Sequence, residues 1–139
     1  MNTIKLIAAL CLFVIFSGCG ESDNSSDTPL TINGEWNLTN VSGGIAGIND
    51  NFPAGTITWT FDSTTNTVEV INNNTNSNLE SMLVSGNYEY SLEANATNPE
   101  LCAYNFVIDE VNFGCYSLTQ NQLTFGQIEA DGYLITLAR

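Results

Sequence analysis

The sequence predicts an all-β domain, and we expect an eight-stranded antiparallel up-and-down barrel, with a β-sandwich as the alternative. Three observations lead to this prediction. Apolar and polar residues alternate with a period of two over most of the stretch 32–139. Clusters of Gly, Asn, Asp and Ser separate the alternating runs. The runs are short and consecutive, which is typical of a meandering sheet, and closing that sheet into a barrel removes its exposed edges.

Eight runs have this pattern, and aromatic and β-branched residues dominate their apolar positions. The expected strands cover 35–41, 56–61, 66–71, 87–94, 102–108, 111–118, 122–130 and 133–138. Asn78–Leu83 is the one stretch that could form a short helix instead.

The last two expected strands are joined through Ala130-Asp131-Gly132-Tyr133. An Asp-Gly pair favours a two-residue type I′ turn, in which both central residues have positive φ. Such a turn pairs Ile128 with Ile135 on the inner face and leaves the apolar residues before Gly126 one residue out of phase. We therefore predict a β-bulge at Gly126-Gln127, which returns those residues to the inner face.

Residues 1–18 have the three parts of an export signal. Lys5 is the positive charge, Leu6–Phe16 is an unbroken apolar run, and Ser17-Gly18 are the small residues expected before a cleavage site. The apolar run has eleven residues, whereas a helix that crosses a hydrocarbon core of ~30 Å needs about 20. Cleavage after this signal makes Cys19 the first residue of the mature protein.

The stretch Phe16-Ser17-Gly18-Cys19 resembles the lipobox of bacterial lipoproteins; an ordinary signal peptide with an incidental cysteine is the alternative. The resemblance implies a diacylglyceryl thioether on Cys19 and an N-acyl chain such as palmitate. Two or more acyl chains hold a protein stably at a membrane. Gly20 stands where an Asp often retains lipoproteins at the inner membrane, so we expect an outer-membrane protein.

Residues 19–31 are polar and lack periodicity, which predicts a lipidated flexible tether. Their acidic, Ser-rich composition resembles the leaders that send some lipoproteins to the cell surface. The folded domain then covers 32–139, which is long enough for one modest core.

The charge of the chain is strongly negative, with 15 acidic and 2 basic residues and a net charge of −13. Removing residues 1–18 leaves the 15 acidic residues against Arg139 alone, a net charge of −14. Because phosphate backbones are bound by clustered Lys and Arg, we do not expect nucleic acid as a partner. We expect a monomer that is held at the membrane through its lipid, and whose charge keeps it soluble or steers a cationic protein partner.

Cys102 and Cys115 are the cysteines left after Cys11 in the signal and Cys19 at the lipid. They lie symmetrically about a turn near Ile108-Asp109, and opposed residues of an antiparallel pair can come within disulfide range. In this register the facing pairs are Cys102 with Cys115, Tyr104 with Phe113, and Phe106 with Val111. The cell envelope is oxidising, so we predict a Cys102–Cys115 disulfide, with two buried free thiols as the alternative.

Catalytic residues are not predicted, and neither is a metal site or a cofactor. The chain has no histidine, and the mature chain has no lysine. This excludes Ser-His-Asp and Ser-Lys hydrolases, Schiff-base chemistry and histidine-based metal sites. The acidic residues in and beside the expected strands, Glu89, Glu93, Asp109 and Glu110, are interpreted as solvated charges.

Four stretches carry a family resemblance: INGEWNLTNVSGG, GTITWTFD, GCYSLTQNQLTF and ADGYLITLAR. In this order they resemble the small lipocalin-like domains of bacterial outer-membrane lipoproteins, which are relatives of the calycin barrels. The resemblance covers 32–139. It implies that a first-strand Trp is stacked by a basic residue from near the last strand and closes one barrel end. Trp36 and Arg139 match these two positions, and a guanidinium over an indole contributes ~0.5–2 kcal/mol.

The same resemblance implies an apolar ligand, for which an eight-stranded barrel has just enough room. The chain is shorter than the larger lipocalins, and its aromatic rings either fill the interior or reach the mouth of the barrel. Buried tyrosine hydroxyls need partners, so several should reach the mouth. The candidate ligand-lining residues are Trp59, Phe61, Tyr88, Tyr90, Tyr104, Phe106 and Tyr133.

Two functions follow from these features. The first is a membrane-anchored lipoprotein that binds a small apolar or amphipathic ligand at the barrel mouth. The alternative is an acidic interaction module that docks on an envelope complex or on a basic host protein such as lysozyme, with the negative charge steering the partner.

Overall fold

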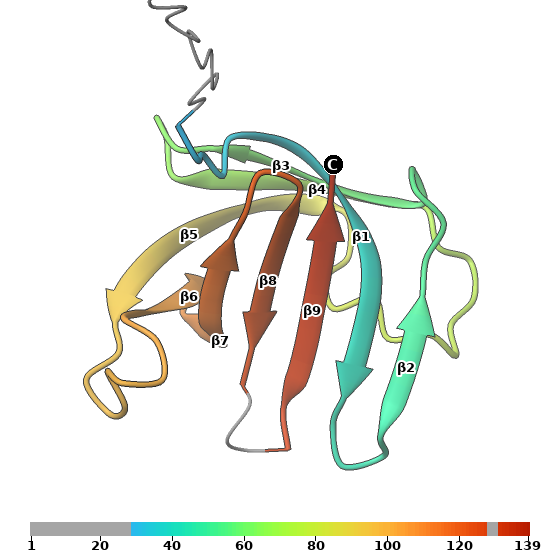
Figure 1. Ribbon diagram of the computed structural model, residues 1–139. Helices are drawn as coiled ribbons and strands as arrows, with labels where there is room; N and C mark the ends of the chain where they lie inside the picture. Colours follow the sequence, from blue (N-terminus) through green and yellow to red (C-terminus); the bar gives the residue numbers. More distant parts are fainter. Residues whose placement is uncertain (1–28, 128–130) are drawn as a thin grey trace, which may run out of the picture.

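The computed structural model describes residues 29–127 and 131–139 and has the all-β fold that the sequence predicts (Figure 1). The described residues form nine strands and no helix. The strands are β1 (Gly34–Gly43), β2 (Ile48–Asn51), β3 (Ile57–Asp62), β4 (Thr67–Asn72), β5 (Gly86–Ala94), β6 (Tyr104–Ile108), β7 (Val111–Leu118), β8 (Gln122–Gly126) and β9 (Tyr133–Ala138).

Strand β1 closes the barrel because it pairs with β3 on one side and with β9 on the other. Each remaining strand from β3 to β9 pairs antiparallel with its neighbours along the chain, which gives the predicted up-and-down barrel of eight strands. The register of β1 shifts between Leu38 and Asn40, so that Leu38 and Val41 are both buried.

The ninth strand, β2, was not predicted. It pairs with the second half of β1 (Asn40↔Asn51). The first half of the same edge of β1 pairs with β3 (Asn37↔Thr58). Residues 52–56 interrupt this edge, and there the Phe52 N–H donates to the Thr39 carbonyl. The sequence of β2, Ile-Asn-Asp-Asn, has too few apolar residues for its alternation to indicate a strand.

The interior of the barrel is filled by the alternating residues that the sequence assigns to it. Trp36, Trp59, Phe106 and Phe125 are fully buried. The rings pack directly on one another, and the centroids of Phe106 and Phe125 lie 4.2 Å apart. Aromatic side chains therefore form the solid core of the barrel.

The hairpin between β8 and β9 differs from the prediction. The ladder from Gln122↔Ala138 to Gly126↔Leu134 has no register shift, and Leu123 and Phe125 are buried. Asp131 has a positive φ of 50° but Gly132 does not, so the predicted type I′ turn is wrong. Within the described ladder, which ends at Gly126 and Tyr133, the predicted bulge is not formed. Ile128 lies outside the described residues.

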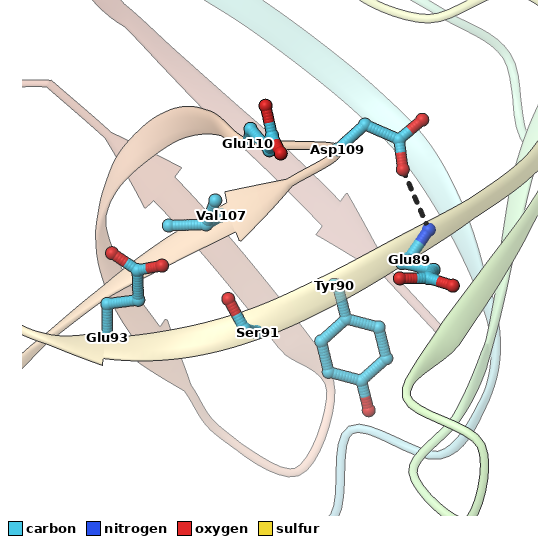
Figure 2. Close-up of a pocket in the computed structure, with 7 residues that line it drawn as sticks. All are labelled: Glu89, Tyr90, Ser91, Glu93, Val107, Asp109 and Glu110. Atoms are coloured by element: carbon cyan, nitrogen blue, oxygen red, sulfur yellow. Dashed lines mark hydrogen bonds between the residues drawn. The ribbon is translucent and has the colours of Figure 1, made fainter.

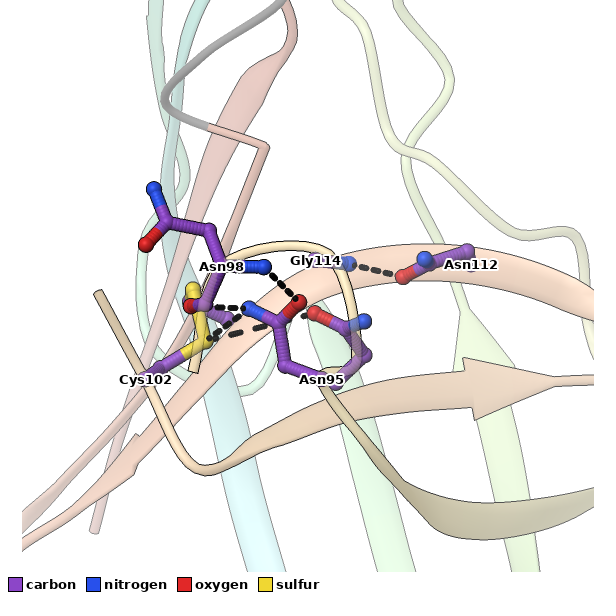
Figure 3. The surroundings of a disulfide bond; sticks show 7 residues. Asn95, Asn98, Cys102, Asn112 and Gly114 are labelled. Carbon is purple, nitrogen blue, oxygen red and sulfur yellow. Dashed lines mark hydrogen bonds between the residues drawn. A yellow bond between two sulfur atoms is a disulfide. The ribbon is translucent and has the colours of Figure 1, made fainter. Parts of the chain in front are cut away.

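The predicted Cys102–Cys115 disulfide is confirmed (Figure 3), with a Cα–Cα distance of 5.7 Å. The predicted register is wrong, because Cys115 pairs with Asn105 and Phe106 pairs with Gly114. Cys102 precedes β6, and the bond links that preceding segment to β7. The facing pairs predicted for Tyr104 and for Phe106 are therefore not formed.

Two features change this register: the turn is centred on Asp109-Glu110, so that Ile108 pairs with Val111, and a bulge at Gly114 adds one further residue. The pairing of β6 and β7 shifts after Phe106, so that Val107 pairs with Asn112. Gly114 has a φ of 91°, and a Cβ atom there would lie 2.2 Å from the Gly126 carbonyl oxygen. Only glycine fits this close approach of β7 to β8.

Asn95 supports the segment that carries Cys102. Its side chain is buried, and its Nδ2 donates to the Asn98 carbonyl at 2.9 Å and contacts Cys102 Sγ at 3.3 Å (Figure 3). Its backbone N–H donates to the Ala103 carbonyl. The disulfide and this amide together fix the connection between β5 and β6.

Candidate functional site

The two ends of the barrel differ. One end holds the start of β1, the β3–β4 and β7–β8 turns and Arg139; the other holds the β1–β2 turn, the end of β8 and the start of β9 (Figure 1). We call the first the closed end and the second the mouth.

Arg139 covers the closed end. Its guanidinium carbon lies 4.2 Å from the ring centre of Trp36, as the resemblance implied for this pair. The guanidinium nitrogens donate to three backbone carbonyls, those of Gln120, Asn33 and Thr31, at 2.9–3.2 Å. Trp36 Nε1 donates to the Ile32 carbonyl at 2.7 Å. The segment that leads into β1 is therefore bonded at the closed end. The Trp36 indole is covered by the Arg139 guanidinium and is hydrogen-bonded to the Ile32 carbonyl.

A small pocket of about 210 Å³ lies at the mouth. Its walls come from β7, β9 and the connections beside them, and they are mostly apolar. The lining residues, which we call the mouth pocket, are Met82, Val111, Asn112, Phe113, Gln127, Tyr133 and Ile135. The volume is below the ~300–1,000 Å³ that is common for ligand pockets, so it fits a small molecule or one end of a longer one.

Met82 reaches the mouth pocket from the long connection between β4 and β5. The helix considered for Asn78–Leu83 is not formed, because asparagine side chains accept bonds from backbone N–H groups two residues on, as Asn76 does from Asn78. The Glu80 N–H donates to Asp50 Oδ2, and the Met82 N–H donates to Glu80 Oε1. These bonds hold Met82 at a φ of 65°, which is rare for a residue with a large side chain.

Five of the seven predicted ligand-lining residues are divided among three places. Tyr133 lines the mouth pocket. Trp59, Phe61 and Phe106 are buried in the core, where they fill the interior. Tyr104 is 51% exposed at the start of β6, so its predicted inward position is wrong.

The remaining two tyrosines, Tyr88 and Tyr90, lie on β5. The Tyr88 hydroxyl donates to the Val84 carbonyl at 2.9 Å. Tyr90 is buried and stacks on Phe106 with centroids 5.3 Å apart. Burial, followed by the nearby Tyr116 and Asp62, raises the pKa of Tyr90 above its ordinary value, so the hydroxyl stays protonated at neutral pH.

Sequence reasoning missed most of the mouth pocket. Tyr133 was predicted, but Met82, Asn112 and Gln127 lie in or next to connections, where no periodicity marks them. The hydrophobicity of Met82 within an Asn-rich and Ser-rich connection was the available signal.

A second, acidic hollow of about 380 Å³ lies along β5 and β6 (Figure 2). The β6–β7 turn forms one side, where Asp109 and Glu110 both have positive φ, as a two-residue type I′ turn requires. Asp109 Oδ1 accepts the Glu89 N–H at 3.0 Å. The lining residues, which we call the acidic groove, are Glu89, Tyr90, Ser91, Glu93, Val107, Asp109 and Glu110.

Within residues 29–127 and 131–139, no three His, Cys, Asp or Glu side chains are arranged to hold a metal ion. The same residues contain no helix long and apolar enough to cross a membrane. Cys19, the signal at 1–18 and most of the tether at 19–31 lie outside the described residues.

Comparison of the chain with protein-family models, with curated proteins and with solved structures finds no match.

Proposed function

We propose that this protein is a lipoprotein, anchored through Cys19 in the outer membrane, whose lipocalin-like barrel binds a small apolar or amphipathic ligand at its mouth. The mouth pocket carries the proposal, because Met82, Phe113 and Ile135 offer apolar walls beside the polar Asn112 and Gln127. A few polar groups within an apolar lining are typical of ligand sites. Because aromatic rings fill the interior, the ligand is bound at the mouth rather than enclosed.

The closed end supports an anchored arrangement. Thr31 and Asn33 are tied to Arg139 at the end opposite the mouth pocket. A tether that starts at a lipidated Cys19 would then join the barrel at its closed end, and the mouth would be left accessible. Metabolic labelling with palmitate tests the anchor: we expect label in the wild-type protein and none in Cys19→Ala.

Native mass spectrometry tests the ligand site. The sample is the mature chain with Cys19→Ala, exported behind a cleavable signal and purified gently; we call it the unlipidated mature chain. We expect an adduct of metabolite or lipid mass that is lost on denaturation. The test variant is Val111→Asp, at a rim position that is 59% exposed, and the matched control is Leu134→Asp, at a position that is 41% exposed on β9. Loss of the adduct in the first variant alone supports the proposal, and equal adducts in both contradict it.

A second candidate function is docking of a basic protein, and the acidic groove favours it. Four carboxylates line this hollow, and complementary charge speeds and orients association. Lysozyme is a suitable basic probe. We expect salt-sensitive binding that weakens in Glu89→Gln/Glu93→Gln and persists in Glu69→Gln, an exposed position on β4. Equal binding by all these variants would contradict docking at the groove.

A further inference from the structure

The indole N–H of Trp59 is buried and has no hydrogen-bond acceptor. Among the residues that the structure describes, Trp59 Nε1 is the one buried side-chain nitrogen or oxygen without a hydrogen-bond partner. The side chain is fully buried on β3, where it packs on Phe61, Phe113 and Phe125. Native proteins rarely leave such a group unpaired, because its lost hydration is not replaced.

The indole lies one side chain behind the wall of the mouth pocket. Phe113 lines that pocket, and its ring meets Trp59 at 83° with centroids 6.4 Å apart. Ile135 also lines the pocket and pairs with Phe125, which stacks on Trp59 at 6.1 Å. The ring of Phe113 therefore lies between the Trp59 indole and the pocket.

The charges around the mouth are negative. Asp50 and Glu80 hold the connection that carries Met82, and Glu110 precedes Val111 of the pocket wall. Arg139 is the one basic residue of the described chain, and it is bonded at the closed end. An anionic ligand would meet like charge at the mouth without a compensating cation.

We infer that the mouth pocket selects an uncharged, mostly apolar molecule whose leading end carries a hydrogen-bond acceptor such as a carbonyl oxygen. In the complex, the Phe113 ring turns aside and Trp59 Nε1 donates to that oxygen. The inference rests on the proposed ligand site and specifies its ligand class.

The requirement for an uncharged ligand can be tested with two fluorescent probes that share a skeleton. Phenylnaphthylamine is neutral, and anilinonaphthalene sulfonate adds one negative charge to it. We expect the unlipidated mature chain to bind the neutral probe about tenfold or more tighter, since like charge at the mouth opposes the sulfonate. Equal affinities, or tighter binding of the sulfonate, would overturn this part of the inference.

The acceptor is tested with acetylnaphthalene and ethylnaphthalene, which have similar shapes and differ by one carbonyl oxygen. Each compound displaces phenylnaphthylamine, and the ratio of the two affinities is compared between proteins. We expect Trp59→Phe to shift this ratio by about fivefold toward ethylnaphthalene, because the carbonyl loses its donor. Trp36→Phe is the matched control at the closed end, where the ratio should stay as in the wild type.

The outcomes separate the inference from the proposed function. If both naphthalenes bind and the ratio is the same in Trp59→Phe and in the wild type, the inferred donor is wrong while the ligand site stands. If neither naphthalene nor the neutral probe binds the wild-type protein, the ligand site itself is wrong. A thermal melt of each variant confirms that it is folded before its ratio is used.

Discussion

Arg139 lies over Trp36 with its guanidinium carbon 4.2 Å from the ring centre, and the same guanidinium donates to the carbonyls of Gln120, Asn33 and Thr31. One side chain thus connects the entry of the chain, the first strand and the β7–β8 turn. The closed end depends on this residue.

Replacing Arg139 by Gln should lower the free energy of unfolding by about 1–2 kcal/mol, because the cation–π contact and the charged hydrogen bonds are lost at a solvent-exposed position. Urea unfolding followed by tryptophan fluorescence measures the change. Arg139→Lys is the control, and its loss should be smaller because the charge stays near the ring. A Gln variant as stable as the wild type would show that the closed end does not need this side chain.

Reducing the Cys102–Cys115 bond should also destabilise the barrel. The two residues are 13 positions apart, and cross-links that close loops of this size contribute about 3 kcal/mol. Urea unfolding with and without reductant measures the difference. The double variant Cys102→Ser/Cys115→Ser should unfold like the reduced protein and should not respond to reductant; an equal response in both proteins would point to another cause.

Gly114→Ala should destabilise the protein far more than Gly47→Ala. Both glycines have positive φ, 91° and 62°, but a Cβ atom at Gly114 would meet the Gly126 carbonyl, whereas one at Gly47 has open space. We expect a loss of about 3 kcal/mol or more at Gly114 and about 1 kcal/mol at Gly47. If thermal or urea melts show similar losses of stability in the two variants, β7 and β8 can move apart to accept the added Cβ atom, which would contradict this prediction.

Stability should fall at alkaline pH because of two tyrosines. Burial raises the pKa of Tyr90 and Tyr116 above the ordinary value of 10.0 in the folded protein. Above pH 10 the unfolded chain loses these protons first, so it binds fewer protons than the folded state and unfolding becomes more favourable. The contribution is complete below pH 10 and is lost as the pH rises through the folded-state values.

Tyrosinate absorbance and urea melts across this pH range give the measurement. The variant Tyr90→Phe/Tyr116→Phe should lose part of the alkaline dependence, since it lacks both groups. Unchanged dependence in this variant would assign the effect to other residues.

Regular alternation made most of the fold predictable. Trp36 and Leu38, and likewise Trp59 and Phe61, lie inside as the period of two requires. The sequence does not reveal where that period breaks. The bulge at Gly114 depends on how closely β7 approaches β8, and this distance is a property of the closed barrel rather than of the local sequence.

The same limit applies to the site. The Cys102–Cys115 pair was predicted from symmetric spacing about the turn. It forms although Cys115 pairs with Asn105, because Cys102 lies in the segment that precedes β6. Met82 was not, because backbone hydrogen bonds within an irregular connection bring it to the mouth. Tyr104 has the parity of Phe106, yet it lies beyond the packed part of the barrel, where the same parity no longer means burial.

Ligand binding at the mouth is tested most directly through Met82. The chain contains two methionines, and Met82 is the one outside the predicted signal at 1–18, so methyl-labelled methionine in the unlipidated mature chain gives one NMR signal inside the mouth pocket. The unlipidated mature chain is titrated with phenylnaphthylamine while the methyl signal and the probe fluorescence are followed. We predict that the methyl signal moves and saturates together with the fluorescence. An unmoved methyl signal during saturating probe binding would contradict a ligand site at the mouth.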